Sequence, residues 1–350
     1  MNLDPLLMRR ALDLATLGRG YVSPNPIVGC VIVHDLGDAA TGRILGEGWH
    51  RQYGGPHAEV NAVRAVSPDD EALLPHATAY VTLEPCSHWG KTPPCADLLI
   101  QKQIGRVACC NDDPNPLVAG RGFQKLREAG IDVVTGLLAD EGRVLNARFF
   151  TFFEQKRPYV ILKWAETADG FIGGPGATPM PISGPLAGRL VHRWRSEEDA
   201  ILVGKTTALH DNPRLNTRLW PGKSPVRVVL DRALTLPQPL HVFDGSQPTL
   251  VYHGSPVAAP ANREKLTYAA ADSLPDLLAD LYERRVQSVL VEGGAQVLTL
   301  FLDAGLWDEI RQFRSPKTLG VGVKAPTPLG TLVSRETVGD DELWTWRQAR

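Results

Sequence analysis

Short apolar runs of strand length alternate with amphipathic segments of helix length, and this alternation constrains the fold more than any other feature of the sequence. Runs such as "IVGCVIV" and "ATAYVTLEP" predict strands, whereas "HAEVNAVRAV" and "GFQKLREAG" predict helices. Strands that are joined through helices tend to pair in parallel. The sequence therefore predicts a fold of the α/β class with much parallel pairing.

A break in this rhythm predicts two domains, which is also the usual expectation for 350 residues. The aromatic-rich segment "LNARFFTFFEQ" runs into "KRP", and a new apolar run begins at Tyr159. We therefore expect one domain over residues 1–148 and a second over residues 157–350.

The charges nearly balance, with 37 basic against 39 acidic residues and no long run of one sign. This balance argues against a protein whose main task is to bind nucleic acid. The segment "MNLDPLLMRRALDLATLGRG" indicates an amphipathic helix and not a signal peptide, and no later segment has the apolar length of a membrane span. We expect a cytoplasmic protein with no nucleic-acid and no membrane partner.

Five cysteines are too few and too unevenly spaced for a disulfide framework. Cys30, Cys109 and Cys110 lie in apolar runs, so we expect them to be buried as small hydrophobic residues. Cys86 and Cys95 differ, because Pro, Ser, His and Gly surround them in "EPCSHWGKTPPC". These two thiols are available to bind a metal.

Two proline-led junctions can bring His57 together with Cys86 and Cys95. Pro56 and the prolines before Cys95 place a candidate ligand at the first turn of each predicted helix, where the helix dipole favours a thiolate. One histidine and two cysteines with an open fourth position make a catalytic zinc arrangement, and Glu59 can take the proton of the activated water. The order His-Ala-Glu and then Pro-Cys matches zinc deaminases, although the eight residues between the cysteines exceed the usual spacing.

Two other classes of protein share parts of this pattern. A nucleic-acid base deaminase shares His57, Glu59 and Cys86, but it usually has a short cysteine spacing and a basic groove. A non-enzymatic module with structural zinc would add a fourth protein ligand, for which His88 is the obvious candidate. A fourth ligand would displace the reactive water. Whether His88 joins the metal ligands therefore separates a catalytic zinc site from a structural one.

Longer stretches resemble a known family. "SPNPIVGCVIV", "GWHRQYGGPHAEVNAV", "AYVTLEPCSHWGKTPPC" and "DPNPLVAGRG" closely resemble the deaminase half of the bifunctional riboflavin-biosynthesis deaminase/reductase family, and "LKWAETADG", "DAILVGKTTALHDNPRLNTR" and "VEGGAQVL" resemble its reductase half. The resemblance implies a cytidine-deaminase-like three-layer α/β/α domain, a dihydrofolate-reductase-like α/β domain, and Zn²⁺ and NADPH as cofactors. It also implies a homo-oligomer, because members commonly self-associate.

The resemblance implies a first reaction in which 2,5-diamino-6-ribosylamino-4(3H)-pyrimidinone 5′-phosphate is deaminated by hydrolysis. Glu59 would relay a proton to the departing ammonia, and the zinc ligands would be His57, Cys86 and Cys95. The implied substrate-binding residues are Asn25, His50, His88, Lys91, Asp113 and Asn115. The charge of Lys91 in a Gly-Lys-Thr loop also suits a phosphate, although a solvated surface lysine would look the same.

The implied second reaction is the NADPH-dependent reduction of the ribosyl group to ribityl. The residues implied on the substrate side are Lys163, Arg195, Leu215, Arg218 and Glu292, and those on the cofactor side are Thr207, Asp211, Gly293 and Gly294. By itself, "VEGGAQVL" predicts a buried strand followed by a glycine turn at which a backbone can approach a phosphate. A plain strand-to-helix turn is the alternative.

One motif departs from the family pattern. Members commonly carry Trp-Ile-Thr before the helix that holds Arg195, whereas this chain has Pro181-Ile182-Ser183. Loss of the tryptophan removes an apolar wall of the expected nicotinamide pocket. A deaminase with a weak or altered reductase is therefore an open alternative. Ser183 is expected to cap the helix "PLAGRLVHRWRSE".

Overall fold

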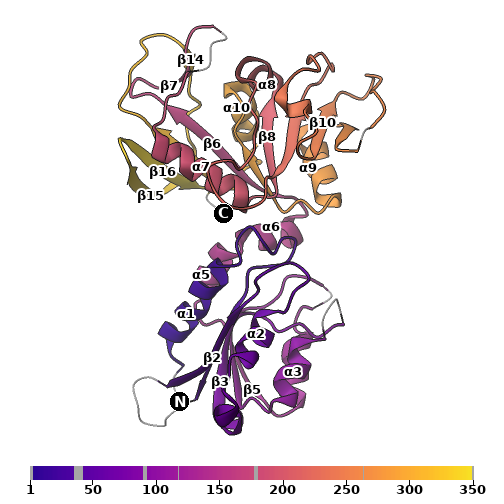
Figure 1. Ribbon diagram of the computed structural model, residues 1–350, viewed down its shortest axis with the longest axis vertical. Coiled ribbons are helices and arrows are strands. Elements are labelled where there is room, and N and C mark those ends of the chain that lie inside the picture. The colour runs from indigo at the N-terminus through magenta and orange to yellow at the C-terminus, as the bar shows by residue number, and fades with distance from the viewer. Residues whose placement is uncertain are drawn as a thin grey trace. The chain divides into compact units, whose positions relative to one another are not determined.

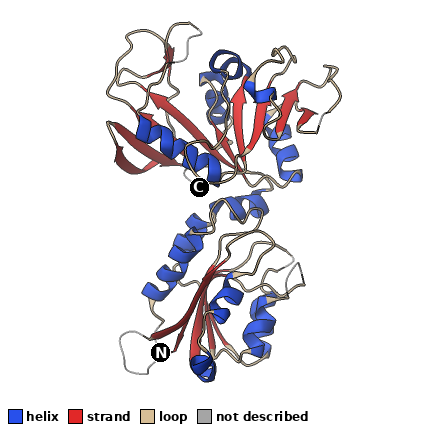
Figure 2. Ribbon diagram, in the orientation of Figure 1, coloured by secondary structure: helices blue, strands red, loops and turns tan. Residues whose placement is uncertain are grey.

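The chain is described by a computed structural model that covers residues 3–34, 42–89, 93–116, 118–176, 180–262 and 264–348. It divides into two compact units, Met1–Gln155 and Lys156–Arg350, each built around a sheet of its own (Figure 1). Helices pack against the strands in both units, which confirms the α/β class (Figure 2). The aromatic-rich helix α6 (Ala147–Gln155) belongs to the first unit.

The first unit contains a five-stranded sheet in the order β2-β1-β3-β4-β5. The expected parallel pairing is confirmed for β3, β4 and β5, but β1 pairs antiparallel with both of its neighbours. Only the residues 35–42 separate β1 from β2, which is too short for the crossover of about a dozen residues that a parallel pair needs. The strands are β1 (Gly29–His34), β2 (Arg43–Trp49), β3 (Ala77–Leu83), β4 (Arg106–Asn111) and β5 (Asp132–Thr135).

Helices cover both faces of this sheet, so the unit has three layers. Because side chains alternate along a strand, Cys30 and Ile32 of β1 join the buried cluster beneath α2 and α3, whereas Val31 and Val33 join the cluster beneath α1. The helices are α1 (Pro5–Thr16), α2 (Ala58–Arg64), the 3₁₀ helix η1 (Pro68–His76), α3 (Cys95–Gln101), α4 (Arg121–Glu128), α5 (Ala139–Leu145) and α6.

The second unit contains a nine-stranded sheet in the order β11-β10-β9-β8-β12-β6-β13-β16-β15. All pairs from β11 to β13 are parallel, and the last two pairs are antiparallel. The strands are β6 (Tyr159–Glu166), β8 (Ala200–Gly204), β9 (Val226–Leu230), β10 (Thr249–His253), β11 (Leu266–Ala270), β12 (Ser288–Val291), β13 (Glu309–Arg314), β15 (Thr331–Val338) and β16 (Asp341–Arg347). The short strands β7 (Phe171–Gly173) and β14 (Val323–Lys324) form a separate pair.

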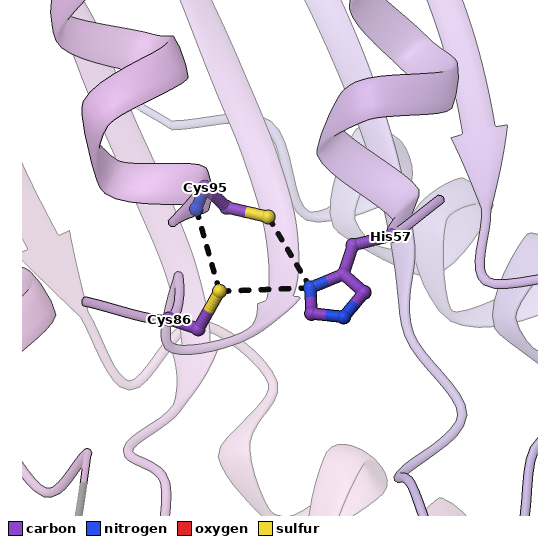
Figure 3. A group of neighbouring side chains, drawn as sticks. All are labelled: His57, Cys86 and Cys95. Carbon is purple, nitrogen blue, oxygen red and sulfur yellow. Dashed lines mark hydrogen bonds between the residues drawn. The ribbon is translucent and has the colours of Figure 1, made fainter. Parts of the chain in front are cut away.

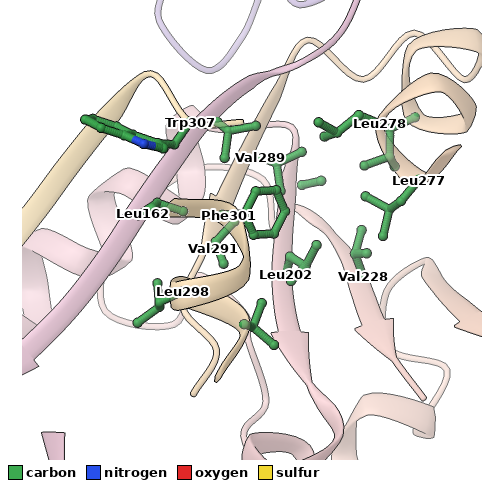
Figure 4. Close-up of a cluster of buried hydrophobic side chains, with 14 of the residues drawn as sticks. Leu162, Leu202, Val228, Leu277, Leu278, Val289, Val291, Leu298, Phe301 and Trp307 are labelled. Carbon is green, nitrogen blue, oxygen red and sulfur yellow. The ribbon is translucent and has the colours of Figure 1, made fainter. Parts of the chain in front are cut away.

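A large apolar core lies between this sheet and two of its helices. Phe301 of α10 and Leu277 of α9 pack with Leu202, Val289 and Val291 of the central strands (Figure 4). This packing fixes the carboxyl ends of the parallel strands at one edge, where ligands of such sheets usually bind. The helices are α7 (Pro185–Glu197), α8 (Lys205–Asp211), the 3₁₀ helix η2 (His241–Phe243), α9 (Leu274–Glu283) and α10 (Ala295–Asp303).

The predicted cap of α7 is wrong. The N-cap residue is Gly184 and not Ser183, and the Gly184 N–H donates to the Asp341 carboxylate over 2.7 Å. The carboxylate of Asp341, the first residue of β16, thus binds the backbone of the N-cap residue of α7. Among the described residues, no helix combines the length and the apolar character that crossing a bilayer requires.

Candidate active sites

Three predicted metal ligands meet in the first unit. The ligand atoms of His57, Cys86 and Cys95 all lie within 4.8 Å of one another (Figure 3). His57 Nδ1 is 3.3 Å from Cys95 Sγ and 3.6 Å from Cys86 Sγ, and the Cys95 N–H donates to Cys86 Sγ over 3.3 Å. His57 is the N-cap of α2 and Cys95 is the first residue of α3, as the proline-led junctions predict. One imidazole nitrogen and two sulfurs are a donor set that suits zinc.

The surroundings of Cys86 favour its thiolate. A hydrogen bond with the Cys95 side chain, and then one with His57, lower the pKa of Cys86 to about 4 although burial opposes this shift. The pKa of Cys95 is raised, because it shares its proton with Cys86 and is buried. One thiol of the pair is therefore ionised at neutral pH, and a bound cation would favour ionisation of the other.

Glu59 lies next to these ligands on the first turn of α2 and is 3% exposed. Burial raises the pKa of its carboxyl, whereas the neighbouring His57 opposes the shift. A carboxyl whose pKa lies closer to neutral pH can both accept and return a proton. Its position therefore suits a proton carrier beside the metal ligands.

His50 and Asn25 form a hydrogen-bonded pair near His57. His50 Nδ1 lies 3.0 Å from the Pro56 carbonyl oxygen, and His50 Nε2 lies 3.2 Å from Asn25 Nδ2. Burial lowers the pKa of His50, so its neutral form donates from Nδ1 and accepts from the Asn25 amide at Nε2. The rings of His50 and His57 meet edge to face, with centroids 5.2 Å apart. The orientation of Asn25 is thus fixed beside the metal ligands.

Asp113 and Asn115 lie together on the segment that follows β4. The Asn115 N–H donates to Asp113 Oδ1 over 2.8 Å. Burial raises the pKa of Asp113 to about 7, and the charges of Glu84 and Cys86 act in the same direction. The influence of Cys86 connects this segment with the metal ligands.

The remaining predicted residues of this site are His88 and Lys91. His88 is exposed, and in the described part of the chain it does not join the group of His57, Cys86 and Cys95. The three ligands without His88 match the catalytic arrangement and not the structural-zinc alternative. Lys91 lies outside the described residues.

A buried cluster of charges occupies the second unit. Arg195 donates from Nε and Nη2 to the two carboxylate oxygens of Glu292 over 2.8 and 2.9 Å, and Lys163 Nζ lies 3.7 Å from the same carboxylate. Burial works to raise the pKa of Glu292, but Arg195 and Lys163 outweigh it and lower this pKa to about 2. Two cations against one anion leave the cluster with a net positive charge, which suits an anionic ligand.

Arg218 and Leu215 lie close to this cluster in the chain's fold. The side-chain oxygen of Asn216 accepts from Arg218 Nη1 over 3.1 Å, and its backbone oxygen accepts from Arg195 Nη1 over 3.3 Å. Asn216 therefore links the two arginines. The side chain of Leu215 is 2% exposed and packs with Val229 and other apolar residues, so it supports this corner from within the core.

A cavity of about 1050 Å³ lies at the carboxyl ends of the parallel strands. Lys163 and Glu292 line it together with three of the predicted cofactor residues, Thr207, Asp211 and Gly294. The cavity thus joins predicted residues of both sides, whereas Arg195, Leu215, Arg218 and Gly293 are not among its lining residues.

The chain after β12 approaches the end of β8 closely, which explains the glycine at position 293. A Cβ atom on Gly293 would lie 2.6 Å from the backbone nitrogen of Gly204, so a side chain there would force the two segments apart. The Gly294 N–H donates to Thr207 Oγ1 over 2.8 Å. The glycine turn predicted from "VEGGAQVL" is therefore where α10 begins.

Met180, Ile182 and Ser183, which surround the departure from the family motif, also line the cavity. Ile182 is buried, and the carbonyl oxygen of Pro181 accepts a hydrogen bond from Lys317 Nζ over 2.9 Å. This segment therefore forms a wall of the cavity without the tryptophan.

The sequence did not indicate a role for Glu84 or His192. Three backbone N–H groups donate to the Glu84 carboxylate. His192 is buried, its Nδ1 has no partner among the described residues, and burial followed by the charges of Arg195 and Arg218 lowers its pKa to about 4. Their positions in the sequence could have indicated a role, because Glu84 directly follows a buried strand and His192 precedes Arg195 by three positions on one helix.

The fold and the two sites define a zinc deaminase of the cytidine deaminase class joined to a reductase. The model of the cytidine and deoxycytidylate deaminase zinc-binding region matches residues 1–111, and that of the RibD C-terminal domain matches residues 158–345. The chain belongs to the RibD family of bifunctional riboflavin-biosynthesis enzymes, with a zinc-dependent deaminase and an NADPH-dependent reductase.

Full-length relatives agree with the family models. The chain is 41% identical to the riboflavin biosynthesis protein RibD of Actinobacillus pleuropneumoniae, over 96% of this chain and 93% of that protein, and 36% identical to RibD of Escherichia coli strain K12, over 99% and 96%. It is similar to the crystal structure of the diaminohydroxyphosphoribosylaminopyrimidine deaminase/5-amino-6-(5-phosphoribosylamino)uracil reductase of Thermotoga maritima, with a TM-score of 0.88, 39% identity and coverage of 99% and 98%. Acinetobacter baumannii RibD gives a TM-score of 0.88 at 33% identity, with 99% of each chain covered. The family resemblance and both predicted domain folds are thereby confirmed.

Proposed function

We propose that residues 1–148 deaminate 2,5-diamino-6-ribosylamino-4(3H)-pyrimidinone 5′-phosphate, and that residues 157–350 then reduce the ribosyl side chain of the product to ribityl. The observation that carries this proposal is the group of His57, Cys86 and Cys95 with Glu59 beside it, on the same chain as a cavity that is lined by Lys163 and Glu292. The Thermotoga maritima protein is named for a deaminase and a reductase activity, and the match covers 98% of it.

In the deaminase, His57 Nδ1 and the sulfurs of Cys86 and Cys95 would hold the zinc. Bound zinc supplies a Lewis acid that makes water nucleophilic near neutral pH. Glu59 takes a proton from the attacking water and returns it to the amino group at C2 of the ring. The carbon–nitrogen bond then breaks, a carbonyl forms and ammonia leaves.

Substrate binding is assigned to residues around these ligands. Asn25, oriented by His50, holds the ring by its amide, and Asp113 with Asn115 contacts the substrate from the segment after β4. A carboxyl with a pKa of about 7, such as that of Asp113, can serve as a hydrogen-bond donor in its neutral form. The assignment of His88 and Lys91 to the substrate rests on the family resemblance.

In the reductase, Arg195 and Arg218 would bind the substrate phosphate, because a guanidinium matches phosphate geometry. NADPH supplies the hydride. Reduction at C1′ breaks the bond to the ribose ring oxygen, which must gain a proton. Lys163, whose pKa is lowered by burial, is placed to donate that proton while Glu292 fixes its position. Leu215 supports the arginine corner from the core.

The cofactor side of the cavity is assigned to Thr207, Asp211, Gly293 and Gly294. Gly294 lines the cavity and Thr207 fixes its turn, while Gly293 allows the close packing on Gly204 that holds this turn in place. A deaminase with an altered reductase is the second candidate, motivated by the Pro181 departure. The buried Ile182 in the cavity wall favours an active reductase instead.

The remaining assignments concern the setting of the enzyme. We place it in the cytoplasm, as a homo-oligomer that acts on small phosphorylated pyrimidines and not on nucleic acid. The near balance of 37 basic and 39 acidic residues supports a small-molecule substrate over a polyanion.

NADPH oxidation tests both activities and their order. The parent protein supplied with the diaminopyrimidinone phosphate should oxidise NADPH, a Glu59→Gln variant should not, and the deaminated product should restore oxidation in that variant. Release of ammonia without NADPH oxidation from either substrate would establish the altered-reductase alternative. Absence of ammonia release in the parent would refute the proposed deaminase.

A further inference from the structure

We propose that Glu84 is a positioning residue of the deaminase, whose carboxylate holds the loop of Asp113 and Asn115 in the position that substrate requires. The proposal rests on the proposed function of Asp113 and Asn115. Glu84 itself touches neither the metal ligand atoms nor the substrate in this mechanism, so its effect would pass through the loop.

The Glu84 carboxylate is buried and fully engaged with backbone. Glu84 directly follows β3, is 4% exposed, and donates its own N–H to the Asn111 carbonyl over 3.0 Å. Its Oε2 accepts from the N–H groups of Asp113 over 3.3 Å and of Gly120 over 2.9 Å, and its Oε1 accepts from the Gly122 N–H over 2.9 Å. One side chain thus binds the start and the end of the loop after β4.

The loop between these contacts is closed by its own hydrogen bonds. The Asn115 carbonyl accepts from the N–H groups of Val118 over 2.8 Å and Ala119 over 3.0 Å, and the Asn115 N–H donates to Asp113 Oδ1. Because the tip is held internally, its position depends on the anchor at its base. Glu84 provides that anchor.

The carboxylate lies where the start of α4 presents backbone N–H groups. Gly120 is the N-cap of α4, so Glu84 lies at the N-terminus of that helix and binds N–H groups that lack partners within it. Hydrogen bonds from N–H groups to a carboxylate are stronger than those to a neutral acceptor. The anchor would therefore weaken if the carboxylate became an amide.

The start of α4 also packs against the segment that leads to the metal ligand Cys86. A Cβ atom on Gly122 would lie 2.1 Å from the Pro85 carbonyl oxygen and 3.1 Å from Glu84 Oε1, so α4 packs directly on the backbone that leads to Cys86. Only a residue without a side chain permits this approach. Glu84 and Gly122 thus fix the position of the loop after β4 relative to the turn that holds Cys86.

A Glu84→Gln variant tests the proposal. Both carboxylate oxygens of Glu84 accept from backbone N–H groups, and the amide NH₂ of glutamine, which is a donor, would replace one of these acceptors. Loss of a charge-assisted hydrogen bond predicts a rise of about tenfold or more in the deaminase KM, with kcat changed by less than about threefold. Zinc content per chain and NADPH oxidation with the deaminated product should match those of the parent. The matched control is Glu128→Gln, which makes the same chemical change on the exposed face of α4, where Glu128 accepts from Gln124.

Gly122→Ala is a second, independent variant that displaces α4 and leaves the carboxylate intact, and it should also raise KM selectively. The proposal is overturned if Glu84→Gln leaves KM within about twofold of the parent, or if Glu84→Gln loses zinc, which would show that Glu84 acts on Cys86 and not on the loop. A parent protein that releases no ammonia would instead refute the proposed function, so the two failures are distinguishable.

Discussion

The two units bury their reactive groups in opposite ways. In the first, the three predicted metal ligands come from two helix starts, at His57 and Cys95, and from the loop after β3 that holds Cys86. In the second, Lys163, Arg195 and Glu292 come from distant segments and meet as full charges. The first arrangement needs a cation to complete it, whereas the second already carries an excess of positive charge.

Removal of zinc should produce the largest difference between the units. Dialysis against a chelator should abolish ammonia release, because the group of His57, Cys86 and Cys95 is then incomplete, while NADPH oxidation with the deaminated product persists. Readdition of zinc should restore ammonia release. Equal loss of both activities would show that the metal stabilises the whole chain and does not act on the first unit alone.

Glu292→Gln should affect the second unit alone. Removing the anion leaves Arg195 and Lys163 buried without compensation, which should cost about 3–5 kcal/mol of unfolding free energy. Reductase kcat/KM should fall by about 100-fold, since displaced substrate groups react much more slowly. Chemical denaturation and both activity assays check this, and an equal fall in ammonia release would contradict it.

The stability difference between parent and Glu292→Gln should depend on pH. The pKa of Glu292 is about 2 in the folded protein, below the ordinary value of 4.5, so its stabilisation is fully present above pH 4.5 and is lost as the pH falls through 2. The difference measured at pH 7 should therefore shrink as the pH is lowered from 4.5 toward 3. A difference that stayed constant over this range would place the stabilisation elsewhere.

Thr207→Val should give the smallest effect. The variant keeps the shape of the side chain and removes the acceptor of the Gly294 N–H, a loss of about 1 kcal/mol. The KM for NADPH should rise by about fivefold with little change in ammonia release. An unchanged KM would mean that the turn at Gly294 needs no such support.

The predicted metal ligands could be found from short motifs in the sequence. Prolines mark the helix starts at which His57 and Cys95 lie, and the spacing of Glu59 from His57 places it on the first turn of the same helix. Most of the parallel strands and several helices also follow from hydrophobic periodicity, but the parallel strands β11 and β13 and the helix α9 were not predicted. The antiparallel strands β15 and β16 were not predicted, since their residues are largely exposed or half-buried and give a weak apolar pattern.

The contacts between distant segments could not be predicted from the sequence and are seen only in the folded chain. The α/β class and the glycine turn of Gly293 and Gly294 follow from residues a few positions apart, and the metal ligands follow from short motifs around His57, Cys86 and Cys95 that can each be recognised in the sequence. Only the fold brought Arg195 to Glu292, Asp341 to the start of α7 and Glu84 to the base of the Asp113 loop. A buried charge or N–H group needs a partner, but the sequence does not say which one, because the sheet order selects the segments that meet.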